Sequence, residues 1–486
     1  MLIGDVISMN LTLLPHIPAS ESPRLSPSWD WSHGDLRVSA DGRSLEQADG
    51  TGFLWLADTA WELLHRCTRA EIAAYLELRA AQGFTVIQTV ALAEMDGLRT
   101  PNAEGHLPFA DLTALTPNEA FWELVDWMIA EAARHGLAVA LLPTWGDKVT
   151  GHWGIGPRIF TPANADTYGH WLGARYATCR NVVWVLGGDR CPMVDLPGGD
   201  RNRLDPQLVA TYQAMALGIQ AGDGGRHLLT YHPWGGESSG THWHQESWLA
   251  FNAQQNGHAA FPDLWNRIAA DRARVPAKPV IDLEPIYEDI PICFDLARNG
   301  WASAWHVRYY AWIQVLAGAC GHTYGCNGVW QMYAPGRQAA CDARLAWRES
   351  MQLPGAWDMG HLRALLLSRP FPSLVPCQDL IVGPAGSHER RIQAARAQDG
   401  SWAVVYASMG HPFNLDLSAL TGTTLRAWWY DPRTGTATWL GQVTRSAQVT
   451  FTPPGSGADQ DWVLVVDDPA RDYPTPGTNN PTDGAR

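Results

Sequence analysis

The stretch Asn181-Val-Val-Trp-Val-Leu-Gly-Gly-Asp-Arg190 indicates the fold of this chain more directly than any other. Its first half is an apolar run of strand length without alternation, which is typical of a strand buried on both faces of a parallel sheet. Gly187 and Gly188 then end the strand and allow the backbone to approach another group closely. Asp189 follows at the position where barrel enzymes place catalytic groups. The stretch therefore predicts a buried parallel strand that carries a candidate catalytic carboxylate.

The same order of elements recurs from Phe53 onward. Apolar runs alternate with helical patterns, such as the capping box Thr68-Arg-Ala-Glu71, which predicts a helix that ends near Gly83. Strands alternating with helices indicate a parallel sheet, and eight such units predict a (β/α)8 TIM barrel. The connection between the fifth and sixth units shows little helical pattern over residues 235–248. The predicted strands are Phe53–Asp58, Thr85–Val90, Ala138–Pro143, Val182–Leu186, His227–Tyr231, Phe251–Gln255, Pro279–Leu283 and Gly321–Tyr324.

The pattern changes after Pro370-Phe-Pro372. Short alternating runs joined by hairpin turns such as Gln398-Asp-Gly400 predict a small antiparallel β-sandwich. Near the other end, the turn at Asp41-Gly42 predicts a hairpin that closes the bottom of the barrel. The expected organisation is an irregular lead-in (1–25), a barrel domain (26–370), a β-sandwich domain (371–470) and a disordered tail (471–486).

Composition narrows the class of partner. The net charge of -14 and the absence of a basic patch argue against binding to nucleic acid or to an anionic membrane. No apolar run reaches the roughly 18 residues that span a bilayer. The N-terminus lacks a basic region and carries Asp5 within its apolar stretch, which predicts no secretory signal and a cytoplasmic location. The 25 tryptophans suggest sugar-stacking surfaces in addition to core packing.

Two carboxylates stand out among the polar residues that follow the predicted strands. Asp189 and Glu284 each come directly after an apolar strand, on strands whose ends can face each other across the barrel mouth. Cleavage of a glycoside needs such a pair, because one group protonates the leaving oxygen while the other attacks or activates water. Alternatively, Asp189 pairs with Arg190 or caps a helix, and Glu284 is a structural loop acid. Asp282 lies on the same side of its strand as Glu284 and is expected to support it.

Other polar and aromatic residues in these loops are expected to bind substrate. Gly187 and Gly188 are interpreted as small residues that leave room for a sugar beside Asp189. A metal site formed by His232, His242, His244 and Glu246 is less favoured than substrate contact or loop packing, because their spacing is irregular. No motif for a cofactor is found. The expected substrate ligands are Asp58, Trp145, Asp147, Arg190, His232, Tyr324 and Trp330.

Several long motifs resemble the apiosidase-like glycoside hydrolases, family 140. The resemblance covers roughly residues 50–370, and the C-terminal part is similar to the β-sandwich, sometimes labelled as collagen-binding, that usually follows in this family. The matching segments are Phe53-Leu-Trp-Leu-Ala-Asp-Thr-Ala-Trp61, Gly83-Phe-Thr-Val-Ile-Gln88, Leu142-Pro-Thr-Trp-Gly-Asp-Lys148, Trp184-Val-Leu-Gly-Gly-Asp-Arg190, Thr230-Tyr-His-Pro233, Gly321-His-Thr-Tyr-Gly-Cys326 and Val329-Trp-Gln-Met-Tyr333.

The resemblance implies a retaining mechanism on β-D-apiosyl linkages, such as those of the plant cell wall pectin rhamnogalacturonan II. It also implies that Asp189 is the acid/base and Glu284 the nucleophile. We therefore expect a retaining glycosidase whose partners are carbohydrates, either apiosides or pectic oligosaccharides. The missing export signal favours a small imported substrate. The alternatives are another pentofuranosidase or β-glycosidase, or a carbohydrate-binding protein without activity, and the oligomeric state stays open.

Overall fold

The computed structural model describes residues 29–193 and 203–478. The expected lead-in (1–25) lies outside the described residues, so the prediction that it is not a secretory signal stays a prediction. Residues 479–486 of the expected tail also lie outside them. No helix within the described part of the chain is long and apolar enough to cross a membrane.

Eight parallel strands form a closed ring, which confirms the predicted barrel. Six of them pair in the order β10-β9-β8-β5-β4-β13, and β11 pairs with β12. Backbone hydrogen bonds join the two groups, since the N–H of Ala250 donates to Leu229 O (2.8 Å) and the N–H of Cys320 donates to Val280 O (3.0 Å). The strands are β4 (Trp55–Thr59), β5 (Val86–Val90), β8 (Ala138–Leu142), β9 (Val182–Leu186), β10 (Leu229–Tyr231), β11 (Asn252–Gln254), β12 (Val280–Asp282) and β13 (Gly321–Tyr324).

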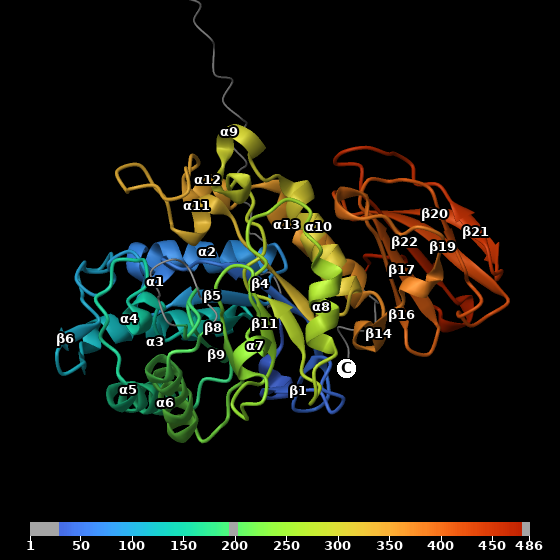
Figure 1. The fold of residues 1–486 in the computed structure, drawn as a ribbon. Coiled ribbons are helices and arrows are strands. Elements are labelled where there is room, and N and C mark those ends of the chain that lie inside the picture. The colour runs from blue at the N-terminus through green and yellow to red at the C-terminus, as the bar shows by residue number, and fades with distance from the viewer. Residues whose placement is uncertain (1–28, 194–202, 479–486) are drawn as a thin grey trace, which may run out of the picture.

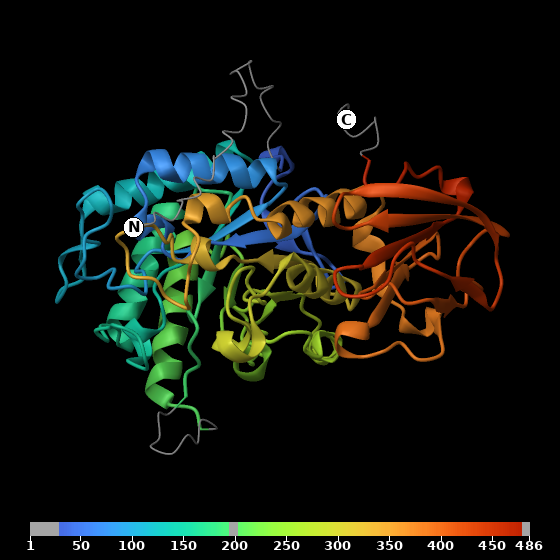
Figure 2. The same ribbon diagram turned by 90° about the horizontal axis from the view of Figure 1, so that it is seen from above.

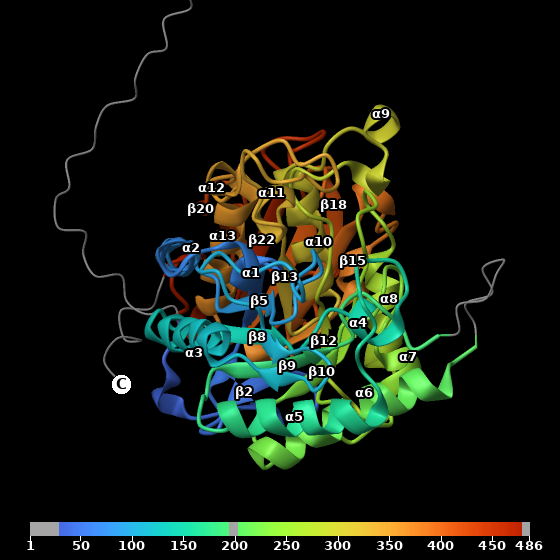
Figure 3. The ribbon, with the colours of Figure 1, turned by 90° about the vertical axis from the view of Figure 1, so that its left-hand side faces the viewer.

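Helices surround this ring (Figure 3). The capping box that the sequence predicts is present at the start of α2, where the Thr68 side chain and the Glu71 side chain each accept the other residue's backbone N–H. Residues 235–248, the least regular connection in the sequence, contain only the single turn α7. The long helices are α2 (Arg69–Ala81), α3 (Glu119–Arg134), α5 (Pro162–Tyr176), α6 (Pro206–Asp223), α8 (Leu264–Arg272), α10 (Ala304–Leu316) and α13 (Pro354–Leu367). The short helices are α1 (Leu63–Arg66), α4 (Asp147–Thr150), α7 (Gly240–Trp243), α9 (Leu296–Asn299), α11 (Asn327–Trp330) and α12 (Trp347–Ser350).

The ring explains why its strand sequences do not alternate. Every residue of β4, β5, β8 and β9 is buried, because one face packs inside the barrel and the other packs against helices. A small antiparallel sheet of β1 (Leu36–Val38), β2 (Leu45–Gln47) and β3 (Gly52–Phe53) closes the opposite end, as predicted. It is tied there by Arg43, which donates to Arg272 O (2.6 Å), and by Asp35, which pairs with Arg226 (2.8 Å).

The C-terminal domain is the predicted antiparallel sandwich. One sheet has the order β14-β16-β17-β22-β19-β20 and the other β15-β18-β21. Residues 472–478 of the expected tail contact both domains. Tyr473 O accepts a hydrogen bond from Arg426 of the sandwich (2.9 Å), and the Gly477 N–H donates to Ser368 Oγ at the end of α13 (3.3 Å). The strands are β14 (Leu374–Pro376), β15 (Ile381–Val382), β16 (Ile392–Ala397), β17 (Trp402–Ala407), β18 (Phe413–Leu415), β19 (Thr424–Asp431), β20 (Thr436–Thr444), β21 (Val449–Phe451) and β22 (Trp462–Asp467), and a separate pair, β6 (Phe109–Asp111) and β7 (Thr116–Pro117), belongs to the barrel domain.

The sandwich lies beside the barrel, next to α10 and α13 (Figures 1 and 2). Trp312 of α10 stacks on Tyr406 of β17 at a centroid distance of 6.0 Å. Next to this stack, the buried guanidinium of Arg308 pairs with Asp358 of α13 (2.8 Å) and with Asp461 of the sandwich (2.8 Å). Asp461 is fully buried. Its charge therefore depends on Arg308 for compensation.

We expect Arg308→Ala to destabilise the protein by about 3–5 kcal/mol, because it leaves Asp461 buried without its cation. Unfolding in urea, followed by tryptophan fluorescence, measures the change. The matched control is Arg471→Ala, since Arg471 pairs with Asp399 on the surface (3.0 Å) and should contribute less than about 1 kcal/mol. Equal losses in the two variants would contradict the role given to Arg308.

Candidate active site

A cavity of about 370 Å³ opens at the carboxyl ends of the barrel strands. Asp189 follows β9 and Glu284 follows β12, and both line this cavity, so the structure brings the two candidate carboxylates together as the sequence predicts. Much of the remaining wall is aromatic, which suits the apolar faces of a sugar ring. The other lining residues include Trp61, Glu94, Met95, Trp145, Ile155, His258, Tyr287, Phe294 and Trp330.

His232, which follows β10, lies between the two carboxylates. Its Nδ1 accepts a hydrogen bond from the backbone N–H of Asp189 (3.1 Å). In a neutral imidazole the other nitrogen then carries the proton, and this Nε2 lies 3.1 Å from Glu284 Oε2. On the other side of Glu284, His258 Nε2 lies 3.5 Å from Oε1. The Glu284 carboxylate is thus held between two imidazoles, one of which also fixes the turn that carries Asp189.

These contacts give the two carboxylates opposite ionisation behaviour. Burial raises the pKa of Asp189 to about 6, and the negative charge of Glu284 adds to this effect against the opposing charge of Arg190. Burial also acts to raise the pKa of Glu284, but the contacts with His232 and His258 outweigh it and lower that pKa to about 2. Near pH 5, one group is therefore protonated and the other ionised, which is the division of roles that glycoside cleavage requires.

Backbone contacts hold the loop that carries Glu284. The buried carboxylate of Asp282 accepts hydrogen bonds from the Glu284 N–H (3.2 Å) and from the side chains of Asn256 (2.8 Å) and Gln314 (2.5 Å). Glu284 O accepts from the Gly257 N–H (3.0 Å), which links the loops after β11 and β12. Asp282 therefore supports Glu284 from below, in line with the expectation from their spacing.

The turn that carries Asp189 has three consecutive positive φ angles. Gly187, Gly188 and Asp189 have φ values of 93°, 61° and 56°, a region that glycine adopts readily and other residues rarely. A Cβ at Gly187 would lie 2.1 Å from His232 O, and one at Gly188 would lie 2.7 Å from the Gly146 N atom. The interpretation that these glycines make room for a sugar is therefore corrected: they allow three backbone segments to pack closely around Asp189.

Most of the polar residues expected to bind substrate lie behind the cavity wall. Trp145 and Trp330 line the cavity, whereas the other five do not. Asp58 accepts from Tyr75 (2.5 Å) and Arg79 (2.7 Å) in the barrel interior, and burial raises its pKa. Tyr324 donates to Glu288 (2.6 Å). The remaining contacts are those of Asp147 with Lys148 (2.9 Å), Arg190 with Asp189 (2.8 Å) and His232 with Glu284 (3.1 Å).

Several cavity residues were not among the expected ligands. Trp61, Glu94, His258 and Tyr287 all follow predicted strands, so their position after a strand was the available signal. Ile155 and Phe294 belong to longer loops and carry no signal in the sequence that distinguishes them. A second cavity of about 620 Å³ adjoins the first and shares Ile155 with it, together with Met95 and Ala340.

The histidine-rich loop after β10 does not converge on one point. His232 contacts Glu284, while His244 lies 3.1 Å from Asn252 Oδ1 and 2.9 Å from Pro276 O. In the described part of the chain, no group of three or more His, Cys, Asp or Glu side chains has a geometry that could hold a metal ion.

Comparisons with known proteins agree with this geometry. The sequence model described as "Apiosidase-like, catalytic domain" matches residues 39–373. The chain belongs to this family. A second model, described as "Putative collagen-binding domain of a collagenase", matches residues 375–467, which form most of the sandwich of this apiosidase-like protein. A search of curated proteins gives no match.

Solved structures place the apiosidase-like chain among glycoside hydrolases. One, described as a glycoside hydrolase, is 32% identical with a TM-score of 0.83 and covers 92% of this chain and 100% of its own. Another, from Bacteroides vulgatus and described as a glycoside hydrolase of family 5, is 31% identical with a TM-score of 0.83 and covers 92% and 96%. A third, from the same organism, shares the fold at 17% identity and a TM-score of 0.62, covering 90% and 82%. The apiosidase-like chain is therefore a glycoside hydrolase.

We expect His232→Ala to move the acidic limb of the pH profile of kcat/KM to higher pH. Removing the imidazole raises the pKa of Glu284 from about 2, and activity is lost as the pH falls through that value because the ionised form is needed. The profile between pH 2 and pH 7 measures the shift, with exposed His170 replaced by Ala as the control. An unchanged acidic limb would show that His232 does not set the ionisation of Glu284.

Proposed function

We propose that this glycoside hydrolase removes β-D-apiosyl or similar pentofuranosyl groups with retention of configuration. The observation that supports this most is that Asp189 and Glu284 line one cavity of an apiosidase-like barrel, where their surroundings raise the pKa of Asp189 and lower that of Glu284. The proposed substrates are plant-derived apiosides or fragments of pectin such as rhamnogalacturonan II. The cavity volume of about 370 Å³ lies at the small end of the range for ligand sites, roughly 300–1,000 Å³, and suits one terminal sugar.

The mechanism follows from the two ionisation states. Asp189 donates its proton to the glycosidic oxygen while Glu284 attacks the anomeric carbon, so that the bond to the aglycone breaks and a glycosyl–enzyme ester forms. Asp189, now ionised, takes a proton from water, and the water oxygen replaces Glu284 at the anomeric carbon. Arg190 keeps Asp189 in place during both steps through its contact with Oδ2 (2.8 Å). The second cavity offers room for the aglycone.

The catalytic roles predict different responses to leaving-group quality. Glu284→Gln should lose roughly three or more orders of magnitude in kcat on every substrate, because the nucleophile is gone. Asp189→Ala should lose a similar factor in kcat on alkyl glycosides, whose leaving oxygen needs a proton. On nitrophenyl glycosides, whose leaving group needs no proton, the rate of glycosyl–enzyme formation should fall far less. Single-turnover kinetics measures both, with exposed Glu123→Gln as the control. Ordinary turnover by Glu284→Gln would sink the assignment.

The sugar and the stereochemistry are tested together with a panel of nitrophenyl glycosides. We expect the highest kcat/KM on the β-D-apioside and lower values on the α-L-arabinofuranoside. Proton NMR of the reaction should show that the sugar is first released as the β anomer. Preference for a pyranoside would favour a β-glycosidase on the same scaffold. Binding without release of nitrophenol from any member would favour a carbohydrate-binding protein, and initial release of the inverted anomer would exclude the retaining mechanism.

A further inference from the structure

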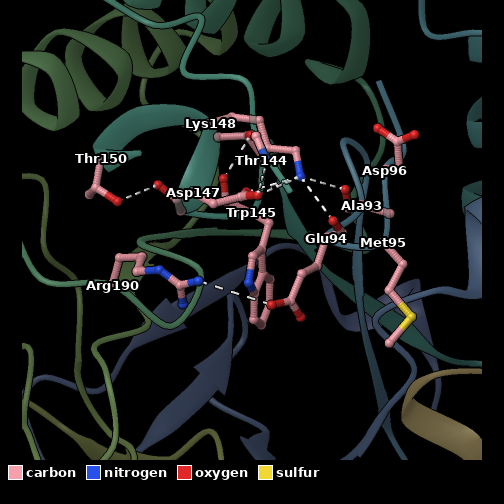
Figure 4. A network of polar contacts seen from close by, with 12 residues as sticks. Ala93, Glu94, Met95, Asp96, Thr144, Trp145, Asp147, Lys148, Thr150 and Arg190 are labelled. Atoms are coloured by element: carbon pink, nitrogen blue, oxygen red, sulfur yellow. Dashed lines mark hydrogen bonds and ion pairs between the residues drawn. The ribbon is translucent and has the colours of Figure 1, made fainter. Parts of the chain in front are cut away.

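Glu94 is a third carboxyl in the catalytic cavity. It follows β5 and lies beside Trp145 (Figure 4). Asp189 and Glu284 line the same cavity. Its side chain is 25% exposed, so it reaches the cavity while most of its surface is covered. Three carboxyl groups in one small cavity repel one another when ionised, and such an arrangement is more often functional than structural.

The carboxyl group of Glu94 has no hydrogen-bond partner among the described residues. Its single ion pair there is a long one, in which Oε1 lies 4.0 Å from Arg190 Nη2. That guanidinium is already occupied, because it donates to Asp189 Oδ2 (2.8 Å) and to the carbonyl oxygens of His152 (3.1 Å) and Trp153 (2.7 Å). The Glu94 oxygens therefore retain their capacity to bind a molecule in the cavity.

The backbone around Glu94 is held firmly, in contrast to its free carboxyl group. The fully buried Lys148 donates through Nζ to Ala93 O (2.7 Å) and Glu94 O (3.3 Å), as Figure 4 shows. On the next residue, the Met95 N–H donates to the buried carboxylate of Glu62 (3.0 Å). Burying these charged groups costs free energy, which is offset by the hydrogen bonds they make. Their effect is to fix the position from which the Glu94 side chain enters the cavity.

The surroundings of Glu94 favour its neutral form. Burial raises its pKa to about 8, and the charges of Asp189, Glu62 and Asp147 add to this effect, while Arg190 opposes it. A neutral carboxylic acid has one O–H donor and one free carbonyl acceptor. This pair matches two neighbouring sugar hydroxyls, one of which accepts while the other donates.

We propose that Glu94 is a specificity-determining residue that binds two hydroxyl groups of the sugar held between Asp189 and Glu284. The inference rests on the proposed function, since it concerns the donor sugar of the same reaction. Its grounds are the shared cavity, the carboxyl oxygens that lack a hydrogen bond among the described residues, and the backbone contacts that hold Glu94 in place. Glu94 contacts the substrate directly, and Lys148 and Glu62 act only as positioning residues.

The first test compares Glu94→Gln, Glu94→Ala and the exposed control Glu77→Gln on the best nitrophenyl glycoside. An amide donates and accepts as a neutral acid does, so Glu94→Gln should keep kcat/KM within about 10-fold of the wild type. Glu94→Ala should lose about 100-fold, the value of roughly two hydrogen bonds. The comparison is repeated on donor glycosides that each lack one hydroxyl. Where the missing hydroxyl is one that Glu94 binds, Glu94→Ala and the wild type should have similar kcat/KM values.

The second test uses the alkaline limb of kcat/KM. The ionisable groups that face Glu94 are Asp189, Arg190, Glu62, Asp147, Lys148 and Cys341, together with Glu284 and His258 across the same cavity. Because Asp189 must be protonated, log kcat/KM should fall with a slope of -1 above about pH 6. Loss of the Glu94 proton should make this slope steeper above about pH 8. Glu94→Gln, which cannot ionise, should keep the shallower slope.

Several outcomes would overturn the inference. One is a Glu94→Ala enzyme with unchanged kcat/KM. Another is a Glu94→Ala enzyme that loses the same factor in kcat/KM on intact donors and on donors that lack a hydroxyl. Together with a lower melting temperature, this result would mean that Glu94 has a structural role. A third is a Glu94→Gln enzyme as impaired as Glu94→Ala. An inactive wild-type protein would instead overturn the proposed function, because all three comparisons require wild-type turnover.

Discussion

The contact of His232 with both candidate catalytic residues is the constraint on which the site depends. One imidazole accepts the backbone N–H of Asp189 and lies 3.1 Å from Glu284. The loops after β9 and β12 are therefore tied through the residue after β10, although β9 and β12 are not neighbours in the barrel. The same ring lowers the pKa of Glu284, and the resulting negative charge helps to keep Asp189 protonated. Position and ionisation of the pair thus have a common origin.

A layer of buried charged and polar groups supports this contact from below. Asp58 with Arg79, Asp147 with Lys148 and Asp282 with Gln314 all lie at the carboxyl ends of strands but behind the cavity wall. Arg79 and Gln314 reach these carboxylates from α2 and α10. Asp147 and Lys148 belong to the same helix but also bind other segments, since the Gly156 N–H donates to Asp147 (2.8 Å) and Lys148 donates to Ala93 O (2.7 Å). Each group can therefore fix the position of a loop without touching a ligand. This explains why the barrel mouth is rich in acidic residues while few of them reach the cavity.

The sequence predicts the barrel well because each of its strands is buried on both faces. The run Val182–Leu186 is reproduced residue for residue in β9, and the Thr68–Glu71 capping box is present in α2. The edge strand β20 carries no such apolar run, because most of its residues are exposed. The sequence does not show how deeply a polar residue near the end of a strand is buried. Asp58 lies at the end of a strand and Glu94 shortly after one, but the first points into the core and the second into the cavity, because tertiary packing decides which of these side chains turns inward.

Arg190 connects the paired carboxylates with Glu94. Its guanidinium contacts Asp189 at 2.8 Å and reaches Glu94 only at 4.0 Å, so its charge is shared unequally. The carboxyl closer to the cation has the lower pKa of the two, about 6 against about 8, as expected when an opposite charge favours ionisation. Glu284, held by two imidazoles, lies lowest at about 2. Three carboxyls in one cavity can therefore serve as nucleophile, proton donor and neutral hydroxyl ligand, because fixed basic side chains separate their ionisation.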